Sequence, residues 1–222
     1  MTEATKQRRA PIAVFVSGGG SNLEAILAAC DARFVAARVV AVVSDQPDAH
    51  GLTRARRRGI PALAVDVRKY ETREAHEEAV LEALAPYAPR LAVLAGYMRM
   101  ITPVLLRYFS PNRAGQLGVI NIHPADTRAY QGVHGYEFAM GLTRKSPERL
   151  EQTFITVHFV DEGMDTGPIL AQVPVPVHPK DTLDQLKDRG LAVEHQLYPR
   201  VIAQVVSGLV ALQDGKVVQP GE

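Results

Sequence analysis

Short apolar runs recur along the first half of the chain, and stretches with helical spacing lie between them. The runs occupy residues 12–16, 39–44, 62–65 and 91–94. Runs of this length, rich in valine and bounded by turn residues, are typical of buried strands. The apolar spacing between the runs predicts helices over residues 21–30, 49–58 and 72–85. Strands that alternate with helices predict right-handed crossovers and a parallel sheet.

The second half departs from this alternation. A helix with Pro103 in its first turn precedes a fifth strand over residues 119–123. Two further runs, 153–160 and 169–177, predict neighbouring strands that pair. A long amphipathic pattern over residues 182–207 predicts a helix with a break near Gly190. The tails, 1–10 and 214–222, are expected to be disordered and loose, which leaves one α/β domain over residues 11–213.

Composition limits the classes of protein to which this chain can belong. The chain has 222 residues, 46% hydrophobic and 22% charged, with a formal net charge of +1, so its overall charge favours neither nucleic acid nor a membrane surface. The sequence has no apolar run long enough to cross a membrane. A lone cysteine, Cys30, excludes a disulfide within the chain and indicates a buried, inert thiol in a reducing compartment. We therefore expect a cytoplasmic protein.

The strand at residues 119–123 carries unusual polar residues. Asn121 and His123 are two positions apart, so their side chains leave the same face of the strand. Pro124 then ends the strand, because proline has no N–H to donate. An amide and an imidazole at the end of a buried strand favour a chemical role.

An acidic loop follows the strand predicted at 153–160. Asp161, Glu162 and Asp165 lie within five positions and are closed by glycine and proline. Such a loop can bring a carboxylate beside His123, which would raise the imidazole pKa and orient the ring for acid/base work. A solvated acidic turn is the alternative. His158, inside the apolar strand, is interpreted as a packed structural residue.

A glycine-rich turn joins the first strand to the first helix. Residues 17–22 read Ser-Gly-Gly-Gly-Ser-Asn, and a helix that begins there presents free N–H groups to an anion. The turn lacks the lysine of a Walker loop and the third glycine of a dinucleotide fingerprint. Phosphate binding is favoured over a plain tight turn in which Ser21 caps the helix.

Other candidate sites are weaker. His134, His123 and Asp165 lack the spacing of a metal set, so no metal is expected. The basic run 54–58 is interpreted as a solvated helix face. The serines lack the Gly-x-Ser-x-Gly elbow of a hydrolase.

Taken together, these motifs resemble the glycinamide ribonucleotide formyltransferases, a branch of the folate-dependent formyltransferases. The matching segments are residues 16–23, 94–99, 121–124, 157–161 and 165–168. The resemblance implies a single-domain Rossmann-like fold, a mostly parallel twisted sheet with helices on both faces. It also implies transfer of a formyl group from 10-formyltetrahydrofolate, a co-substrate, to the amine of 5′-phosphoribosylglycinamide in purine synthesis.

The resemblance assigns a role to each matching residue. The catalytic residues are Asn121, as donor to the formyl oxygen, His123, as a protonated oxyanion partner and proton shuttle, and Asp165, which tunes His123. The residues matched to phosphoribosylglycinamide binding are Gly20, Ser21, Asn22 and Glu194. The residues matched to folate binding are Arg73, Met98, Arg99, Met100, Ile101, Asp161, Glu162, Gly163 and Met164.

Some segments depart from the family pattern, and rival functions stay open. Residues 125–128 read Ala-Asp-Thr-Arg in place of the usual Ser-Leu-Leu-Pro, and the loops 110–118 and 143–152 are longer. The rivals are a formyltetrahydrofolate hydrolase and a folate- or nucleotide-binding relative without turnover. The hydrolases normally carry a domain in front, whereas formyltransferases that act on initiator tRNA or sugars carry a C-terminal extension. The expected partners are small molecules, with no nucleic acid and no membrane, for a monomer or homodimer.

Overall fold

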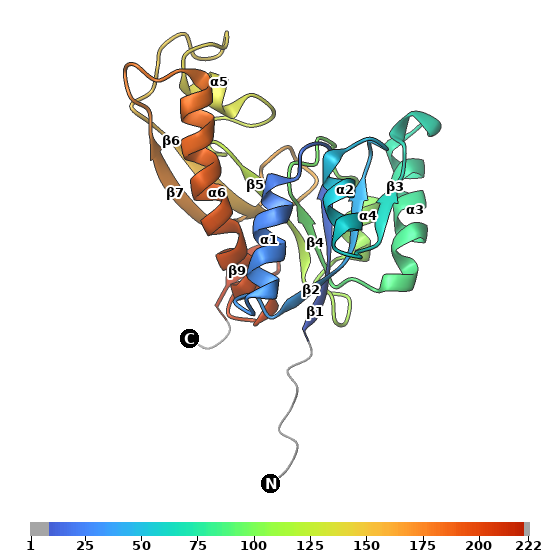
Figure 1. Ribbon diagram of the computed structural model, residues 1–222. Coiled ribbons are helices and arrows are strands. Elements are labelled where there is room, and N and C mark those ends of the chain that lie inside the picture. The colour runs from blue at the N-terminus through green and yellow to red at the C-terminus, as the bar shows by residue number, and fades with distance from the viewer. Residues whose placement is uncertain (1–8, 220–222) are drawn as a thin grey trace.

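The computed structural model describes residues 9–219 (Figure 1). Its strands are β1 (Ala10–Val16), β2 (Ala37–Ser44), β3 (Ala62–Ala64), β4 (Leu91–Leu94), β5 (Gly118–His123), β6 (Gln152–Phe159), β7 (Ile169–Pro176), β8 (Ala211–Gln213) and β9 (Lys216–Val218). Its helices are α1 (Ser21–Asp31), α2 (His50–Arg57), α3 (Arg73–Leu84), α4 (Pro103–Tyr108), α5 (Gly135–Ala139) and α6 (Leu183–Val206), with short 3-10 helices η1 (Val67–Lys69) and η2 (Ala85–Tyr87).

Seven strands form one sheet in the order β3-β2-β1-β4-β5-β6-β7. The pairs from β3 to β5 are parallel, whereas β6 runs antiparallel to both of its neighbours. Parallel neighbours need long crossovers, and α1 to α4 lie in the connections between β1 and β5. The mostly parallel sheet is therefore confirmed, and the paired strands β6 and β7 supply its antiparallel part.

Helices cover both faces of this sheet, as expected (Figure 1). On one face, Ile12 of β1 belongs to a buried cluster with Leu23 of α1 and Leu197 of α6. On the other face, Phe15 belongs to a cluster with Val80 of α3. Successive strand residues point to opposite faces, so a strand covered on both sides reads as a continuous apolar run. This is why the first half of the chain reveals its strands so clearly.

The last long helix is continuous, and the predicted break near Gly190 is wrong. Thr182 and Gln185 form a reciprocal capping box that starts α6. Gly190 is buried, and a Cβ added there would lie only 2.1 Å from the hydroxyl oxygen of Tyr136. The glycine therefore makes room for α5 to pack on α6 and does not interrupt the helix.

Both predicted tails need correction. Ala10 belongs to β1, so the sheet begins inside the segment expected to be disordered. Residues 214–218 are not a loose tail, because β8 and β9 pair as an antiparallel hairpin. Its turn residues, Asp214 and Gly215, both have positive φ (49° and 73°), as a type I′ turn requires. Residues 1–8 and 220–222, the rest of the two expected tails, lie outside the described residues.

The order of the strands places a crevice between β1 and β4. The chain proceeds from β1 outward to β2 and β3, then returns to β4 on the other side of β1. At such a switch point, the loops beyond the carboxyl ends of the two strands separate and leave room for a ligand. Here the glycine-rich turn follows β1, and residues 95–101 follow β4. The N–H of Ser17 donates to the carbonyl of Gly96 at 2.9 Å, which joins the two segments.

Candidate functional site

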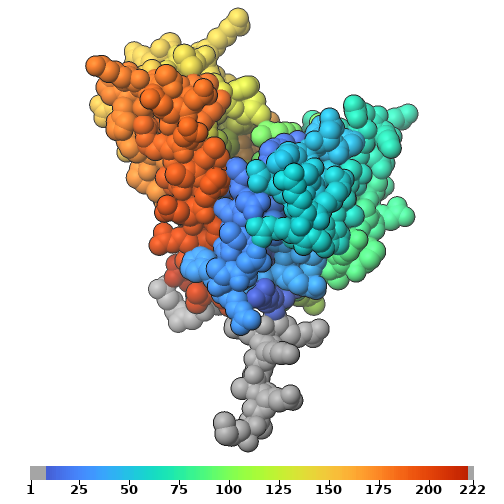
Figure 2. Space-filling model, viewed as in Figure 1, coloured from blue at the N-terminus to red at the C-terminus, as the bar shows by residue number. Residues whose placement is uncertain are grey.

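A cleft with a volume of about 820 Å³ opens beyond the carboxyl ends of β4 and β5. Figure 2 shows the molecule hollowed between the blue and cyan N-terminal residues and the orange and yellow C-terminal ones. The segments that line the cleft include residues 96–101, 121–124, 130–137 and 163–165, joined by Lys145, His158 and Lys187. Most of its walls are therefore loops, and its floor is the end of β5.

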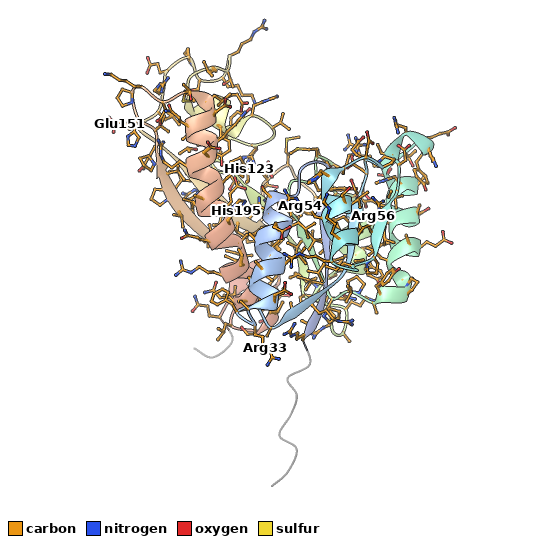
Figure 3. The ribbon with its side chains drawn as sticks, viewed as in Figure 1. Arg33, Arg54, Arg56, His123, Glu151 and His195 are labelled. Carbon is orange, nitrogen blue, oxygen red and sulfur yellow. The ribbon has the colours of Figure 1, made fainter. Side chains whose placement is uncertain are left out.

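The three predicted catalytic side chains meet at this floor. Asn121 Nδ2 lies 3.3 Å from Asp165 Oδ1, and His123 Nδ1 lies 3.6 Å from Asp165 Oδ2. One carboxylate therefore faces both polar side chains of β5, although the three residues come from two distant segments. In Figure 3, His123 lies between the two halves of the molecule.

Burial has the largest effect on the pKa of His123. The residue is only 6% exposed, and burial lowers the pKa of its imidazole more than the nearby Asp165 carboxylate raises it, while His158 lowers it further. Asp165 does act on the ring as expected, but the predicted net rise of the pKa is wrong. His123 is therefore neutral at rest near neutral pH. Its Nε2 is buried without a hydrogen-bond partner among residues 9–219.

Asp165 is held as a carboxylate. The backbone N–H of Gly132 donates to its Oδ2 at 2.8 Å. Burial alone would raise the pKa of Asp165, but the interactions with the His158 and His123 rings and with the N–H of Gly132 together lower it. The Asp165 side chain is 14% exposed, so it is not part of a freely solvated acidic turn. Its backbone has φ of 53°, in the left-handed region.

His158 is a member of the site that the sequence did not reveal. Its Nδ1 lies 2.8 Å from the carbonyl oxygen of Phe159, so this nitrogen carries a hydrogen. Its Nε2 lies 3.5 Å from Asp165 Oδ1 and 3.3 Å from Asn121 Nδ2. His158 is buried, as expected of a packed structural residue, and it also contacts two predicted catalytic side chains. The pairing of His158 with Asn121 across β5 and β6 creates this contact.

The glycine-rich turn lies beside the cleft, at the start of α1. Gly20 is the N-cap residue, with φ of 72°, and no side chain caps the helix. The alternative in which Ser21 caps α1 is therefore wrong. A Cβ on Gly20 would lie 2.8 Å from the Cα of Gly51, so only glycine lets the turn approach α2 so closely.

Asn22 and Glu194 are joined directly. Asn22 Nδ2 donates to Glu194 Oε2 at 2.6 Å, and the hydroxyl of Tyr136 donates to Glu194 Oε1 at 2.7 Å. The buried Glu194 of α6 therefore connects the start of α1 with α5. Tyr136 also lines the cleft, and no sequence motif marks it, because it is simply an aromatic residue in a short helix. Burial and the charge of Glu194 raise the pKa of Tyr136, which keeps its hydroxyl as a donor.

The residues matched to folate binding divide into two groups. Those that line the cleft are Met98, Arg99, Met100, Ile101, Gly163 and Met164. Arg73, Asp161 and Glu162 do not line it. Arg73 is exposed at the start of α3, whereas Asp161 accepts hydrogen bonds from Gly163 N–H and the Thr166 hydroxyl and so shapes the loop.

The segment that departs from the family pattern turns its charges away from the cleft. Arg128 donates to both carboxylate oxygens of Asp126, at 2.9 and 3.1 Å. Gln172 of β7 contacts both residues, at 2.9 Å from Arg128 and 3.2 Å from Asp126. Neither charge lines the cleft. The loop after α5 does reach it, because Lys145 lines the cleft and lies 5.6 Å from the ring of Tyr130.

The basic run on α2 is only partly a solvated face. Arg54 and Arg58 form ion pairs with Glu24 of α1. Arg56 is exposed. The prediction of a solvated face is therefore confirmed for Arg56, Arg57 and Arg58, which are exposed, and is wrong only for Arg54, which is partly buried against α1.

The thiol of Cys30 fits the expectation from composition. Cys30 is buried, and burial raises its pKa to about 11, so its thiol is inert near neutral pH. Among residues 9–219 no three histidine, cysteine or acidic side chains gather as a metal site would need. Within the same residues, no helix is both long and apolar enough to cross a membrane.

Comparison with known proteins identifies the family. A family model described as formyl transferase matches residues 10–202. The phosphoribosylglycinamide formyltransferase of Bacillus subtilis (strain 168) is 38% identical over 196 residues, 87% of this chain and 93% of that protein. The phosphoribosylglycinamide formyltransferase of Escherichia coli (strain K12) is 35% identical over 203 residues, 91% of this chain and 90% of that protein.

Solved structures agree with the sequence relatives. The crystal structure of glycinamide ribonucleotide transformylase 1 from Symbiobacterium toebii matches with a TM-score of 0.87 at 37% identity, covering 99% of this chain and 98% of that chain. The phosphoribosylglycinamide formyltransferase from Bacillus halodurans matches with a TM-score of 0.80 at 36% identity, over 89% of this chain and 95% of that chain. The chain therefore belongs to the formyl transferase family, as its motifs predicted.

Proposed function

We propose that this protein transfers the formyl group of 10-formyltetrahydrofolate to the amine of 5′-phosphoribosylglycinamide, a step of purine biosynthesis. The observation that carries the proposal is the convergence of Asn121, His123 and Asp165 on one cleft. The names of the relatives in Bacillus subtilis and Escherichia coli support the choice of substrate.

His123 moves the proton that the reaction must transfer. The attacking amine loses a proton, and the nitrogen that releases the formyl group gains one. Because burial lowers its pKa, His123 is neutral at rest and can accept the amine proton. Asp165, whose carboxylate lies 3.6 Å from His123 Nδ1, stabilises the imidazolium that forms. The substrate amine is itself the nucleophile, so the protein forms no covalent intermediate.

Asn121 stabilises the charge that develops on the formyl oxygen. Its amide nitrogen has two hydrogens, and the contact with Asp165 Oδ1 at 3.3 Å fixes the amide plane with one of them. The second hydrogen faces His158 Nε2 at 3.3 Å, and when substrate is bound it donates to the formyl oxygen in the manner of an oxyanion hole. His158 Nε2 lies 3.3 Å from the Asn121 amide nitrogen and 3.5 Å from Asp165 Oδ1, so His158 helps to orient both side chains.

The residues of the cleft fit a folate. Met98 and Met164 line the mouth of the cleft and are 67% and 45% exposed, an apolar surface that a flat ring system would cover. The orphaned Nε2 of His123 suits a polar group of a substrate. When bound, 10-formyltetrahydrofolate supplies the electrophilic formyl carbon. Arg99 lines the cleft, and we assign the exposed Arg73 to the acidic tail of the folate. Asp161 and Glu162 act through the loop that carries Asp165.

The phosphate of the second substrate belongs at the start of α1. The N–H groups of the first helical turn have no partners within the helix and carry the positive end of its dipole. Gly20, Ser21 and Asn22 present these groups beside the cleft. Glu194 holds Asn22 in place through the bond of 2.6 Å and also serves the ribose and glycinamide part.

Release of tetrahydrofolate from 10-formyltetrahydrofolate tests the proposal. We expect release only when phosphoribosylglycinamide is present, with one formylated product for each tetrahydrofolate. Release at the same rate without the amine would identify a formyltetrahydrofolate hydrolase. No release under either condition would identify a binding protein without turnover.

Variants test the catalytic residues in the same assay. His123→Ala and Asp165→Asn should each reduce kcat by about 100-fold or more, the usual scale for loss of an acid/base group. Asp126→Asn is the matched control, because this carboxylate faces Arg128 and Gln172 outside the cleft. A near-normal rate in either site variant would remove that residue from the mechanism.

We also propose that the protein is cytoplasmic and works as a monomer or homodimer. Fractionation of cells and sedimentation of the purified protein check these two points. An assembly larger than a dimer would contradict the second.

A further inference from the structure

The N-terminal half of α2 contacts the carbonyl groups of the glycine-rich turn through Gly51, His50 and Arg54. The backbone N–H of Gly51 donates to the carbonyl oxygen of Gly18 at 3.0 Å. Arg54 Nε donates to the carbonyl oxygen of Gly19 at 2.9 Å, and His50 Nδ1 lies 3.4 Å from the same oxygen. Two successive carbonyl groups of the turn therefore point toward α2.

This arrangement fixes which atoms the turn presents at the start of α1. A carbonyl oxygen that pointed to the same side as the free N–H groups would repel an anion, so a phosphate site needs those oxygens turned away. Arg54 is the only long side chain among the three contacts, and its guanidinium also donates to Glu24 Oε2 of α1 at 3.3 Å. Arg54 therefore links both sides of the turn, Gly19 before it and Glu24 after it.

A second observation points to a ligand at this place. Asn22, in the first turn of α1, is only 7% exposed, and its amide nitrogen bonds to Glu194. Its amide oxygen is buried and has no hydrogen-bond partner among residues 9–219. A buried acceptor without a partner is costly, and a phosphate cannot satisfy it because its oxygens are acceptors too; a hydroxyl group of the ribose that carries the phosphate would supply the donor.

We propose that Arg54 is a positioning residue for the phosphate of the substrate, acting through the carbonyl of Gly19 and not through the reacting atoms. The inference rests on the proposed function, which places the phosphate at this turn. Its consequence is specific, because loss of Arg54 should weaken recognition of the phosphate and leave the formyl-transfer groups intact.

Arg54→Met tests this role. We expect the KM for phosphoribosylglycinamide to rise about 10-fold, the scale of one lost hydrogen bond at the turn, with kcat and the KM for 10-formyltetrahydrofolate unchanged. Arg56→Met is the matched control, since Figure 3 shows Arg54 between α1 and α2 and Arg56 on the other side of α2. The control should behave as the wild type.

Two further measurements distinguish positioning of the phosphate site by Arg54 from general loss of structure and from an effect of the arginine charge alone. Ribosylglycinamide without its phosphate should have the same KM in the wild type and in Arg54→Met. A rise with this substrate as well would mean a merely structural role and overturn the inference. Arg54→Lys keeps the charge but not the guanidinium that spans Gly19 and Glu24, so its KM should also rise. A wild-type KM in Arg54→Lys would overturn the inference in favour of charge.

Binding of inorganic phosphate distinguishes failure of this inference from failure of the proposed function. Calorimetry should detect weaker phosphate binding to Arg54→Met than to the wild type or to Arg56→Met, whether or not phosphoribosylglycinamide is a substrate. Turnover of phosphoribosylglycinamide with an unchanged KM in Arg54→Met would refute the inference alone. Absence of turnover together with weaker phosphate binding in Arg54→Met would refute the proposed function alone.

Discussion

At the scale of the residue, His123 shows how burial and charge oppose each other. Removal from water disfavours the imidazolium, and the neighbouring His158 disfavours it further. The Asp165 carboxylate favours it but is the smaller effect. The neutral ring is therefore the resting form, and a pKa below the ordinary value of 6.5 sets the acid limit of a reaction that needs this base.

A pH profile checks this balance. As the pH falls through the pKa of His123, the ring takes a proton and loses its function as a base, so kcat/KM should fall with an apparent pKa below 6.5. Asp165→Asn removes the anion that raises the pKa, so the acid limb should move to still lower pH, on top of the lower rate. Ionisation of the substrate amine is common to both proteins and cancels in the comparison. An acid limb that stays at the same pH in Asp165→Asn, or that moves to higher pH, contradicts this account.

The site could be predicted from the sequence only where it depends on short motifs. Asn121 and His123 were found because two polar residues interrupt an apolar strand, and Asp165 because its loop matches a family motif. His158 and Tyr136 were missed because their roles depend on which side chains face them across β5, β6 and α6. The pKa of His123 was misjudged because a sequence shows the neighbouring charge but not the depth of burial.

At the scale of the element, a buried carboxylate starts α4. Glu77 of α3 accepts hydrogen bonds from Thr102 N–H at 2.7 Å, from the Thr102 hydroxyl at 2.6 Å and from Leu105 N–H at 3.0 Å. Burial raises the pKa of Glu77, and these bonds act in the opposite direction. The carboxylate holds the end of the segment 97–101, which lines the cleft. The buried carboxylate of Glu77 therefore positions residues 97–101, a loop of the site.

Glu77→Ala should therefore lower the free energy of unfolding by about 3 kcal/mol, at about 1 kcal/mol for each lost hydrogen bond. It should also raise the KM for 10-formyltetrahydrofolate, because residues 97–101 lose their anchor. Urea unfolding and steady-state kinetics measure the two effects. Glu78→Ala, at an exposed position of the same helix, is the control and should change neither. Equal stability of the two variants would show that the carboxylate does not support α4.

Helices and strands could be predicted from the sequence where they are long and have a clear hydrophobic pattern. The strands β1 and β4, and residues 39–43 of β2, are continuous apolar runs, which indicate buried strands. The hairpin of β8 and β9 has strands of three residues each, too short for any period, and only its Asp-Gly turn could have revealed it. Gly190 was misread because a glycine in a helix can mark either a break or a close contact, and the partner, Tyr136, lies far away in sequence.

At the scale of the whole molecule, the cleft and the terminal hairpin are separated. The cleft lies beyond the carboxyl ends of the parallel strands, whereas Figure 1 shows β9 at the far end of α6 from α5. Leu212 and Val217 of the hairpin pack against the hydrophobic core on the face covered by α1 and α6. The hairpin should therefore contribute to stability without contributing to the chemistry.

Deletion of residues 214–222 tests this separation. Loss of β9 exposes part of Leu212 and removes Val217, so the free energy of unfolding should fall by about 1–2 kcal/mol. Both KM values should stay at those of the full chain. Deletion of residues 220–222 alone keeps the hairpin and should leave stability unchanged. A truncated protein with full stability, or with altered KM values, would show that the hairpin has another role.

The left-handed backbone at Asp165 has a consequence for how the protein can change. Few residues other than glycine adopt a φ near the observed 53°, and asparagine and aspartate are the main exceptions. Variants at this position that are selected for folding alone should therefore be aspartate, asparagine and glycine, whereas selection for turnover should keep aspartate. Asparagine differs from aspartate by one atom and one nucleotide change. A folded descendant of this enzyme with little turnover is thus a single substitution away, and relatives that bind substrates but convert them slowly would be easy for evolution to reach.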